Sequence, residues 1–189
     1  MVLIAAFEPF AGHQGNSGAT VERVLQDRIP GVCVVTEILP VSWNQVEERV
    51  PALVVHWKPR VLEGLGEGPA AHVMVERVAH HIGMGVDAVG REPRQGRLLL
   101  GGPKERRSTM EFDVAWKLSR DVAVMHSDDS GQYLTNALRY SALAQPVPRV
   151  GLVHLPSQGT ETEEIYAARY VPIITGIVQH NLPMPSTSP

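Results

Sequence analysis

Short apolar runs rich in Val, Ile and Leu alternate along this chain with longer segments of helical spacing. Such runs indicate buried strands, and the segments between them indicate helices that cover a sheet. Because a parallel strand pair needs a long crossover connection, this alternation favours parallel strands. We predict an α/β fold, a three-layer sandwich with a mostly parallel central sheet. The predicted strands lie in 2–7, 31–39, 60–68, 72–81, 122–127 and 149–156, and the predicted helices in 20–28, 43–57, 112–121, 131–144 and 161–180.

Length and charge limit the classes of protein that fit. With 189 residues, 43% of them hydrophobic, the chain is long enough for one core, so we expect a single domain over 1–182 and a flexible tail over 183–189. A net charge of −3 argues against a nucleic-acid or anionic-membrane partner. No apolar run approaches the roughly 20 residues of a membrane span, so a cytoplasmic protein is expected. The one cysteine, Cys33, excludes an internal disulfide, and its valine neighbours predict an inert, buried thiol.

Two candidate side chains lie in predicted strands, and sites in parallel sheets collect at the carboxyl ends of the strands. His154 closes the apolar run RVGLV, where it fits either a general base or a hydrogen-bonded core histidine. Glu76 lies within VMVERVA, where a carboxylate either orients a histidine or faces solvent. Because Arg77 follows it, the residues alone favour an edge strand with its charges outside.

A third candidate, Thr135, lies in HSDDSGQYLTNALRYSAL (126–143). This stretch predicts a strand end, an acidic turn and a helix, with Asp129 or Ser130 as the helix cap. Thr135 would then lie near the unpaired N–H groups of the helix start, where a nucleophile is activated. Taken alone, an ordinary helix threonine bonded to a backbone carbonyl is the commoner interpretation.

Two other patterns resemble ligand sites but lack essential parts. GLGEG (64–68) imitates a dinucleotide-binding turn, yet no predicted helix follows it directly. His72, His80 and His81 occur without an HExxH motif or paired cysteines, and neighbouring strand residues point to opposite faces. We therefore predict no cofactor and no metal.

Five stretches taken together resemble the pyroglutamyl peptidases, which remove an N-terminal pyroglutamate from peptides. They are similar to that family's opening FEPF-G-G loop, its ILPV segment, the strand with its catalytic glutamate, its S-N-x-A-G-x-Y-L-C-N segment and the strand with its catalytic histidine. The order and spacing agree from Val2 to about Pro156. The stretches are FEPFAGHQGN (7–16), ILPVSW (38–43), VERVA (75–79), SDDSGQYLTNALRYSAL (127–143) and GLVHLP (151–156).

The resemblance implies roles for individual residues. Glu76 falls on the family's catalytic glutamate and His154 on its catalytic histidine. Phe10 falls in the loop that flanks the pyrrolidone ring, and Asn16 matches an asparagine near the end of that loop. The family's nucleophilic cysteine falls on Thr135, so a hydroxyl stands where the resemblance implies a thiol.

Two further positions depart from the family pattern. An arginine that helps form the family's site corresponds to Val86, unless Arg91 or Arg94 compensates for it. The glutamine of the family's G-Q-A-G-G-R loop corresponds roughly to Gly66. A hydroxyl is also far less acidic than a thiol, so the histidine must remove its proton during attack.

These observations leave two hypotheses from different classes. One is a pyroglutamyl-peptidase-type hydrolase of weak activity that uses Thr135 with His154 and Glu76 on a peptide or small pyroglutamyl substrate. The other is a catalytically inactive relative that binds a small cyclic amide, a peptide end or a protein partner. Under either hypothesis the resemblance implies a single α/β domain and a homotetramer.

Overall fold

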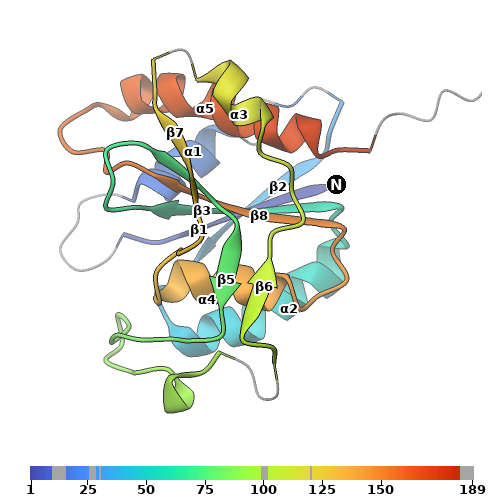
Figure 1. Ribbon diagram of the computed structural model, residues 1–189, viewed down its shortest axis with the longest axis vertical. Coiled ribbons are helices and arrows are strands. Elements are labelled where there is room, and N and C mark those ends of the chain that lie inside the picture. Colours follow the sequence, from blue (N-terminus) through green and yellow to red (C-terminus); the bar gives the residue numbers. More distant parts are fainter. Residues whose placement is uncertain (10–15, 26–28, 30, 99–101, 120, 184–189) are drawn as a thin grey trace, which may run out of the picture.

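A six-stranded sheet forms the centre of the computed structural model, which describes residues 1–9, 16–25, 29, 31–98, 102–119 and 121–183 (Figure 1). The strand order is β2-β1-β3-β8-β4-β7, and only the β4–β8 pair is antiparallel. The mostly parallel sheet predicted from the sequence is therefore confirmed. Its strands are β1 (Val2–Phe7), β2 (Val34–Leu39), β3 (Val61–Glu67), β4 (Val73–Glu76), β7 (Val124–Ser127) and β8 (Arg149–Leu155).

Helices cover both faces of this sheet, which gives the three layers (Figure 1). One face packs against α1 (Ser17–Leu25), α3 (Val114–Leu118) and α5 (Glu163–His180). The other face packs against α2 (Trp43–Trp57) and α4 (Leu134–Ala142). Because both faces are covered, the strands read as nearly continuous apolar runs, as is usual in parallel sheets.

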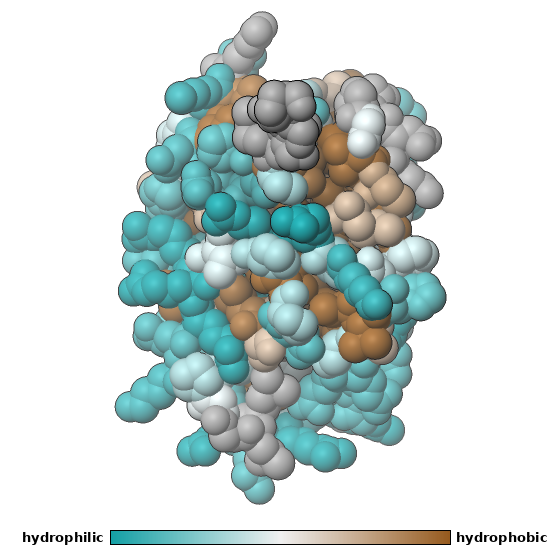
Figure 2. All heavy atoms as spheres, turned by 90° about the vertical axis from the view of Figure 1, so that its right-hand side faces the viewer, coloured by the Kyte–Doolittle hydropathy of each residue, from teal (hydrophilic) through white to brown (hydrophobic). Residues whose placement is uncertain are grey.

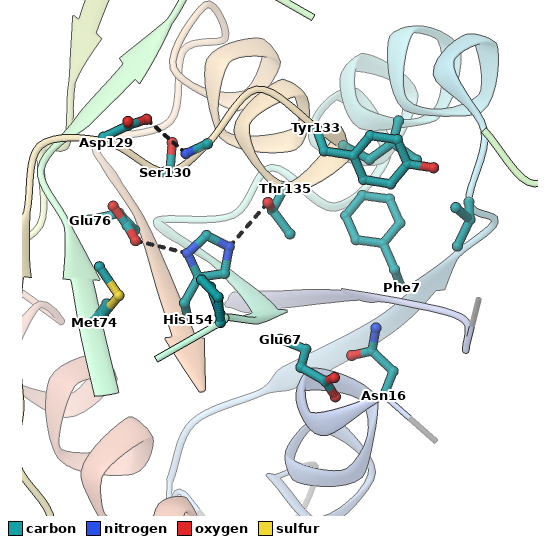
Figure 3. A pocket seen from close by; sticks show the side chains of 14 residues that line it. Phe7, Asn16, Glu67, Met74, Glu76, Asp129, Ser130, Tyr133, Thr135 and His154 are labelled. Carbon is teal, nitrogen blue, oxygen red and sulfur yellow. Dashed lines mark hydrogen bonds and ion pairs between the residues drawn. The ribbon is translucent and has the colours of Figure 1, made fainter. Parts of the chain in front are cut away.

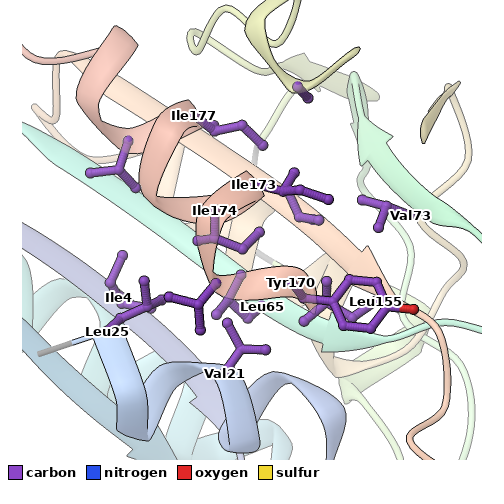
Figure 4. Packing of buried hydrophobic residues seen from close by; sticks show 14 of the residues in the cluster. Ile4, Val21, Leu25, Leu65, Val73, Leu155, Tyr170, Ile173, Ile174 and Ile177 are labelled. Atoms are coloured by element: carbon purple, nitrogen blue, oxygen red, sulfur yellow. The ribbon is translucent and has the colours of Figure 1, made fainter. Parts of the chain in front are cut away.

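The core on the α1, α3 and α5 face is made largely of branched aliphatic side chains (Figure 4). Ile173, Ile174 and Ile177 of α5 belong to one cluster with Leu65 of β3 and Val21 of α1, and Ile174 lies nearest to Leu65 among these isoleucines in the view of Figure 4. Each fully buried side chain of this size stabilises the fold by roughly 1.5–3 kcal/mol. The second core, on the α2 and α4 face, adjoins the candidate site described below.

Figure 2 shows one face on which hydrophilic side chains predominate, with hydrophobic patches between them. Within the described ranges, no helix combines the length and hydropathy that a membrane crossing requires. The predicted tail falls mostly on 184–189, which lie outside the described residues.

The predicted strand over 72–81 is wrong in one respect, because the chain divides it between two sheets. β4 ends at Glu76 and joins the central sheet, whereas β5 (Val78–His80) pairs antiparallel with β6 (Glu105–Arg107). The region 83–109, predicted to be irregular, supplies β6 and a short 3₁₀ helix at Arg94–Gly96. β5 and β6 are too short for an alternation of apolar and polar residues to be recognised in the sequence.

Two local predictions also need correction. The start of α4 is capped neither by Asp129 nor by Ser130: the cap position is Tyr133, which makes no side-chain capping bond. Asp129 instead accepts a hydrogen bond from the Gly131 N–H (2.9 Å) within the turn. Cys33 is exposed, because it precedes β2, an edge strand. The absence of a helix directly after the glycines of 64–68 is confirmed, because β3 ends at Glu67 and the next element is β4.

Candidate active site

A pocket of ≈ 380 Å³ lies where several strand ends meet the start of α4. Phe7 ends β1, Glu67 ends β3 and Glu76 ends β4, while the turn that follows β7 adds Asp129 to the wall. The carboxyl ends of the parallel strands β1, β3 and β8 meet at this edge of the sheet, and the antiparallel β4 brings Glu76 alongside β8 from the opposite direction. Its lining also includes Asn16, Val41, Pro69, Met74, Ser130, Gly131, Tyr133, Leu134, Thr135 and His154.

Glu76, His154 and Thr135 form one hydrogen-bonded chain beside this pocket (Figure 3). The His154 Nδ1 lies 2.8 Å from Glu76 Oε1, and the His154 Nε2 lies 3.1 Å from Thr135 Oγ1. Glu76 is 0% exposed and His154 is 6% exposed, whereas Thr135 is half-buried at the pocket. The structure thus brings together three side chains that are 78 and 19 positions apart in the chain.

The carboxylate fixes the direction of the imidazole. An ionised carboxylate only accepts hydrogen bonds, so the His154 Nδ1–H donates to Glu76. In a neutral imidazole the other nitrogen is then an acceptor, and the Thr135 hydroxyl donates to His154 Nε2. This is the arrangement in which an imidazole can take a proton from an alcohol. Because β4 lies between β8 and β7, the edge-strand interpretation of Glu76 is wrong.

The start of α4 supplies backbone donors next to the hydroxyl. Thr135 is the second residue of this helix, and the first intrahelical bond runs from the Ala137 N–H to the Tyr133 carbonyl (3.1 Å). The earlier N–H groups therefore have no acceptor within the helix, and no side chain caps them. Together with the helix dipole, such groups favour a negative charge on a nearby oxygen.

Two glycines of β3 and its following turn allow the histidine and the threonine to approach each other. A Cβ at Gly66 would lie 2.5 Å from Thr135 Cγ2 and 2.7 Å from His154 Cδ2. A Cβ at Gly68 would lie 2.9 Å from His154 Cβ. All three distances are too short for a real side chain. The glycines that imitate a dinucleotide-binding turn thus make room for the Thr135 methyl group and the His154 ring.

Comparison with known proteins shows which family the chain belongs to. The model of the pyroglutamyl peptidase family matches residues 1–165. The chain belongs to this family. It is 30% identical over 165 residues to a pyrrolidone-carboxylate peptidase of Thermococcus onnurineus, with 82% of each chain covered. It is 29% identical over 166 residues to the human pyroglutamyl-peptidase 1, and this alignment covers 84% of this chain and 79% of the human protein.

Solved structures of pyrrolidone carboxyl peptidases share the fold. The enzyme of Thermus thermophilus superposes with a TM-score of 0.85 at 21% identity, covering 95% of this chain and 100% of that one. An E192A variant of the Pyrococcus furiosus enzyme gives a TM-score of 0.84 at 21% identity and covers 96% and 99% of the two chains. The α/β architecture is therefore that of the pyroglutamyl peptidase family.

Of the two residues that the family resemblance assigns to the ring loop, the structure describes one. Asn16 lines the pocket and is 4% exposed, while Phe10 lies outside the described residues. The Asn16 Oδ1 accepts hydrogen bonds from the Gly18 N–H (2.9 Å) and the Ala19 N–H (3.3 Å) at the start of α1. Its amide nitrogen is consequently the group left for the pocket, and Figure 3 shows it turned toward Phe7.

At the positions where the chain departs from the family pattern, the pocket wall is built differently. Val86 is 55% exposed and does not line the pocket, but its carbonyl accepts a hydrogen bond from the Tyr133 hydroxyl (2.9 Å). Tyr133 also packs edge-to-face on Trp43 at 5.4 Å between ring centres. Arg91 and Arg94 are exposed and do not line the pocket, so neither replaces the family's arginine there.

Sequence reasoning missed one residue of the pocket wall and two buried charged residues outside it. Glu67 lines the pocket and accepts hydrogen bonds from the Ser17 hydroxyl (2.8 Å) and the Ser17 N–H (3.2 Å). Arg139 and Glu63 are fully buried and do not line the pocket. The signal for Glu63 was present, because RVLEGL places a carboxylate in an apolar strand as VMVERVA does. Arg139 gave none, since arginine is an ordinary residue in a helix. Within the described part of the chain, no group of three or more His, Cys, Asp or Glu could hold a metal ion.

Proposed function

We propose that this protein is a pyroglutamyl-peptidase-type hydrolase that removes an N-terminal pyroglutamate from peptides, with Thr135 as the nucleophile. The observation that carries the proposal is the Glu76–His154–Thr135 chain, which ends on a hydroxyl at the start of a helix beside the pocket. Membership of the pyroglutamyl peptidase family supports the choice of substrate.

The proposed reaction has two stages. Thr135 Oγ1 attacks the carbonyl carbon of the pyroglutamyl amide while its proton passes to His154 Nε2. The negative charge on the carbonyl oxygen is stabilised by the free N–H groups at the start of α4. His154 then gives the proton to the departing amine nitrogen as the C–N bond breaks, which leaves a threonyl ester. Water, deprotonated by His154, hydrolyses the ester and releases pyroglutamate.

The pocket suits a small, uncharged ring with one donor and one acceptor. Phe7, Val41 and Tyr133 provide apolar walls, and the Asn16 amide nitrogen is a donor for a ring carbonyl. The Glu67 carboxylate is an acceptor at the same wall. A lactam ring offers the complementary carbonyl and N–H groups.

We expect turnover to be slow. A threonine hydroxyl is a weaker nucleophile than a thiolate at neutral pH, and its extra methyl group restricts rotation about χ1. In this site the methyl group already packs against Gly66, which limits the positions that Thr135 Oγ1 can adopt. Threonine nucleophiles in other hydrolases are commonly activated by an N-terminal amine, which position 135 does not have.

Several finer expectations form part of the same proposal. We propose that Phe10 flanks the bound ring, that 1–182 form a single domain, and that the protein is a cytoplasmic homotetramer. The composition supports a single domain over 1–182. The family resemblance supports the contact of Phe10 with the ring and the homotetramer.

The test is hydrolysis of a fluorogenic pyroglutamyl amide by the wild type, by Thr135→Cys and by His154→Ala. We expect low wild-type activity, a gain with Thr135→Cys because a thiolate forms beside the imidazole, and loss of activity with His154→Ala. Iodoacetamide provides the matched control. It should label Cys33 in the wild type without reducing the activity, and should inactivate Thr135→Cys in a background in which Cys33 is replaced by serine.

Two results would contradict the proposal. If neither the wild type nor Thr135→Cys hydrolyses the amide, but pyroglutamate still binds by calorimetry, the protein is an inactive binding relative. If His154→Ala leaves the wild-type rate unchanged, the hydrolysis comes from elsewhere on the molecule.

A further inference from the structure

A buried arginine lies directly behind the candidate site. Arg139 of α4 is 0% exposed, and its Nη2 donates hydrogen bonds to the Val78 carbonyl and to Ser130 Oγ (2.9 Å). Its Nε and Nη1 have no hydrogen-bond acceptor among the described residues. Removing a guanidinium from water is costly unless nearby negative charge compensates for it, so the surroundings of Arg139 decide what it does.

Two buried carboxyl groups provide that compensation. Burial lowers the pKa of Arg139 to about 10, while the charges of Glu76 and then Glu63 act to raise it. Arg139 therefore stays positively charged at neutral pH. Burial also raises the pKa of Glu63 well above its usual range, which the charge of Arg139 only partly offsets. Glu63 is thus the carboxyl that tends to hold a proton, and of the two carboxyl groups Glu76 has the larger effect on the pKa of Arg139.

The hydrogen bonds of Arg139 also join two parts of the site. The Val78 carbonyl lies two residues after Glu76, where the chain passes from β4 into β5. Ser130 lines the pocket in the turn before α4, and its hydroxyl also donates to Asn136 Oδ1 (3.1 Å). One side chain therefore links the strand that carries Glu76 to the turn that precedes Thr135.

We propose that Arg139 is a positioning residue of this site, a fixed positive charge that keeps Glu76 as a carboxylate and His154 as a neutral imidazole. A neutral imidazole is the form that can accept a proton from an alcohol, so this role suits a threonine nucleophile. A thiolate, by contrast, is stabilised by an adjacent imidazolium. The value of this role for catalysis rests on the proposed function. The effect of Arg139 on the charge state of the Glu76–His154 pair can be tested without it.

Other charged groups around this pair lie farther toward solvent. Glu67 and Asp129 line the pocket from β3 and from the turn after β7. Arg77 and Asp128 pair with each other on the exposed side, where salt and water screen their fields. Among the described residues within this region, Arg139 is the buried cation.

The test is a pH titration of the His154 ring signals by NMR on isotope-labelled protein, with His154→Gln used to assign them. In Arg139→Met the positive charge is lost, so an imidazolium is less strongly repelled. We expect the midpoint of the His154 titration to rise by roughly one pH unit, which is a tenfold gain in proton affinity. Arg139→Lys keeps the charge, so its midpoint should differ from that of the wild type by no more than about a third of that change.

Two further variants keep the outcome decisive. Arg139→Gln is a second neutral variant, and its amide can still donate to the Val78 carbonyl if Arg139→Met does not fold. Glu63→Gln is the matched control, because it replaces a protonated carboxyl by an amide of the same shape and should leave the midpoint unchanged. An unchanged midpoint in the folded neutral variants overturns the inference. Since the titration needs no turnover, this failure is distinct from a failure of the proposed hydrolase activity.

Discussion

Glu76 and Glu63 lie on β4 and β3, the two strands that flank β8, and both are 0% exposed. Glu76 accepts a hydrogen bond from His154 at 2.8 Å. The two carboxyl oxygens of Glu63 have no hydrogen-bond partner among the described residues. Burial of a carboxylate within an apolar strand therefore does not by itself indicate a catalytic role. The group that the carboxylate faces is the informative feature.

Their surroundings differ for a reason visible in the strand register. Glu63 is opposite Gly151 in the β3–β8 ladder, and a Cβ at Gly151 would meet Glu63 Oε2 at 2.9 Å and Phe112 Cζ at 3.0 Å. The Glu63 carboxyl therefore occupies space that a glycine leaves open beside apolar side chains. Glu76 instead faces the His154 ring from the neighbouring strand.

The same substitution at these two positions gives the largest expected difference. Glu76→Gln should reduce hydrolysis of the pyroglutamyl amide by roughly a hundredfold to ten-thousandfold, because an amide can hold His154 in the wrong tautomer. Glu63→Gln should leave the rate within about threefold, since Glu63 does not contact the reacting groups. Rates are measured in the Thr135→Cys variant if the wild type is too slow. Similar losses in both variants would remove the distinction between the two carboxylates.

β3 should contribute to the site through Gly66 rather than through Glu63. Gly66→Ala places a methyl group against Thr135 Cγ2 and the His154 ring, so we expect roughly a tenfold to hundredfold loss of activity and a destabilisation of about 1–3 kcal/mol. Thr135→Ser removes one of the clashing groups and should recover part of the lost stability in the double variant. Unfolding by denaturant and the amide assay measure the two effects. Additive stability losses in the double-mutant cycle would show that the two side chains do not contact each other.

The smallest expected effect concerns the pH dependence of stability. Because the pKa of Glu63 is raised in the folded chain, that chain still holds a proton at pH values where the unfolded chain, with its ordinary value of 4.5, has released it. Stability from this group is therefore lost as the pH rises above the unfolded value. Glu63→Gln has no such proton, so its Tm relative to the wild type should rise by a few degrees between about pH 5 and about pH 8.

Calorimetric melting of the two proteins across that range measures this difference. A Tm difference that stays constant with pH would mean that Glu63 is ionised in the fold to the same extent as in the unfolded chain. In that case Glu63, and not only Glu76, would be a counter-charge of Arg139.

The elements that could be read from the sequence are those with long, regular patterns. The apolar runs of β1 and β8 and the spacing of α2 and α5 gave the layers and the parallel sheet. The prediction of a single strand failed at Glu76–Val78, where the chain passes from one sheet to another without any change in composition. It also failed at the start of α4, because Asp129 and Ser130 bond within the turn and to Asn136 instead of capping the helix.

What the sequence determined by itself is the order of strands and helices and the family, because periodicity and short motifs are local properties that survive without a structure. Only the tertiary structure decided which polar groups meet. The contact of His154 with Glu76 and Thr135 depends on strand order, and the approach of Thr135 depends on the missing Cβ of Gly66. The charge of Arg139 behind them depends on burial, a property of the packed molecule that no single segment carries.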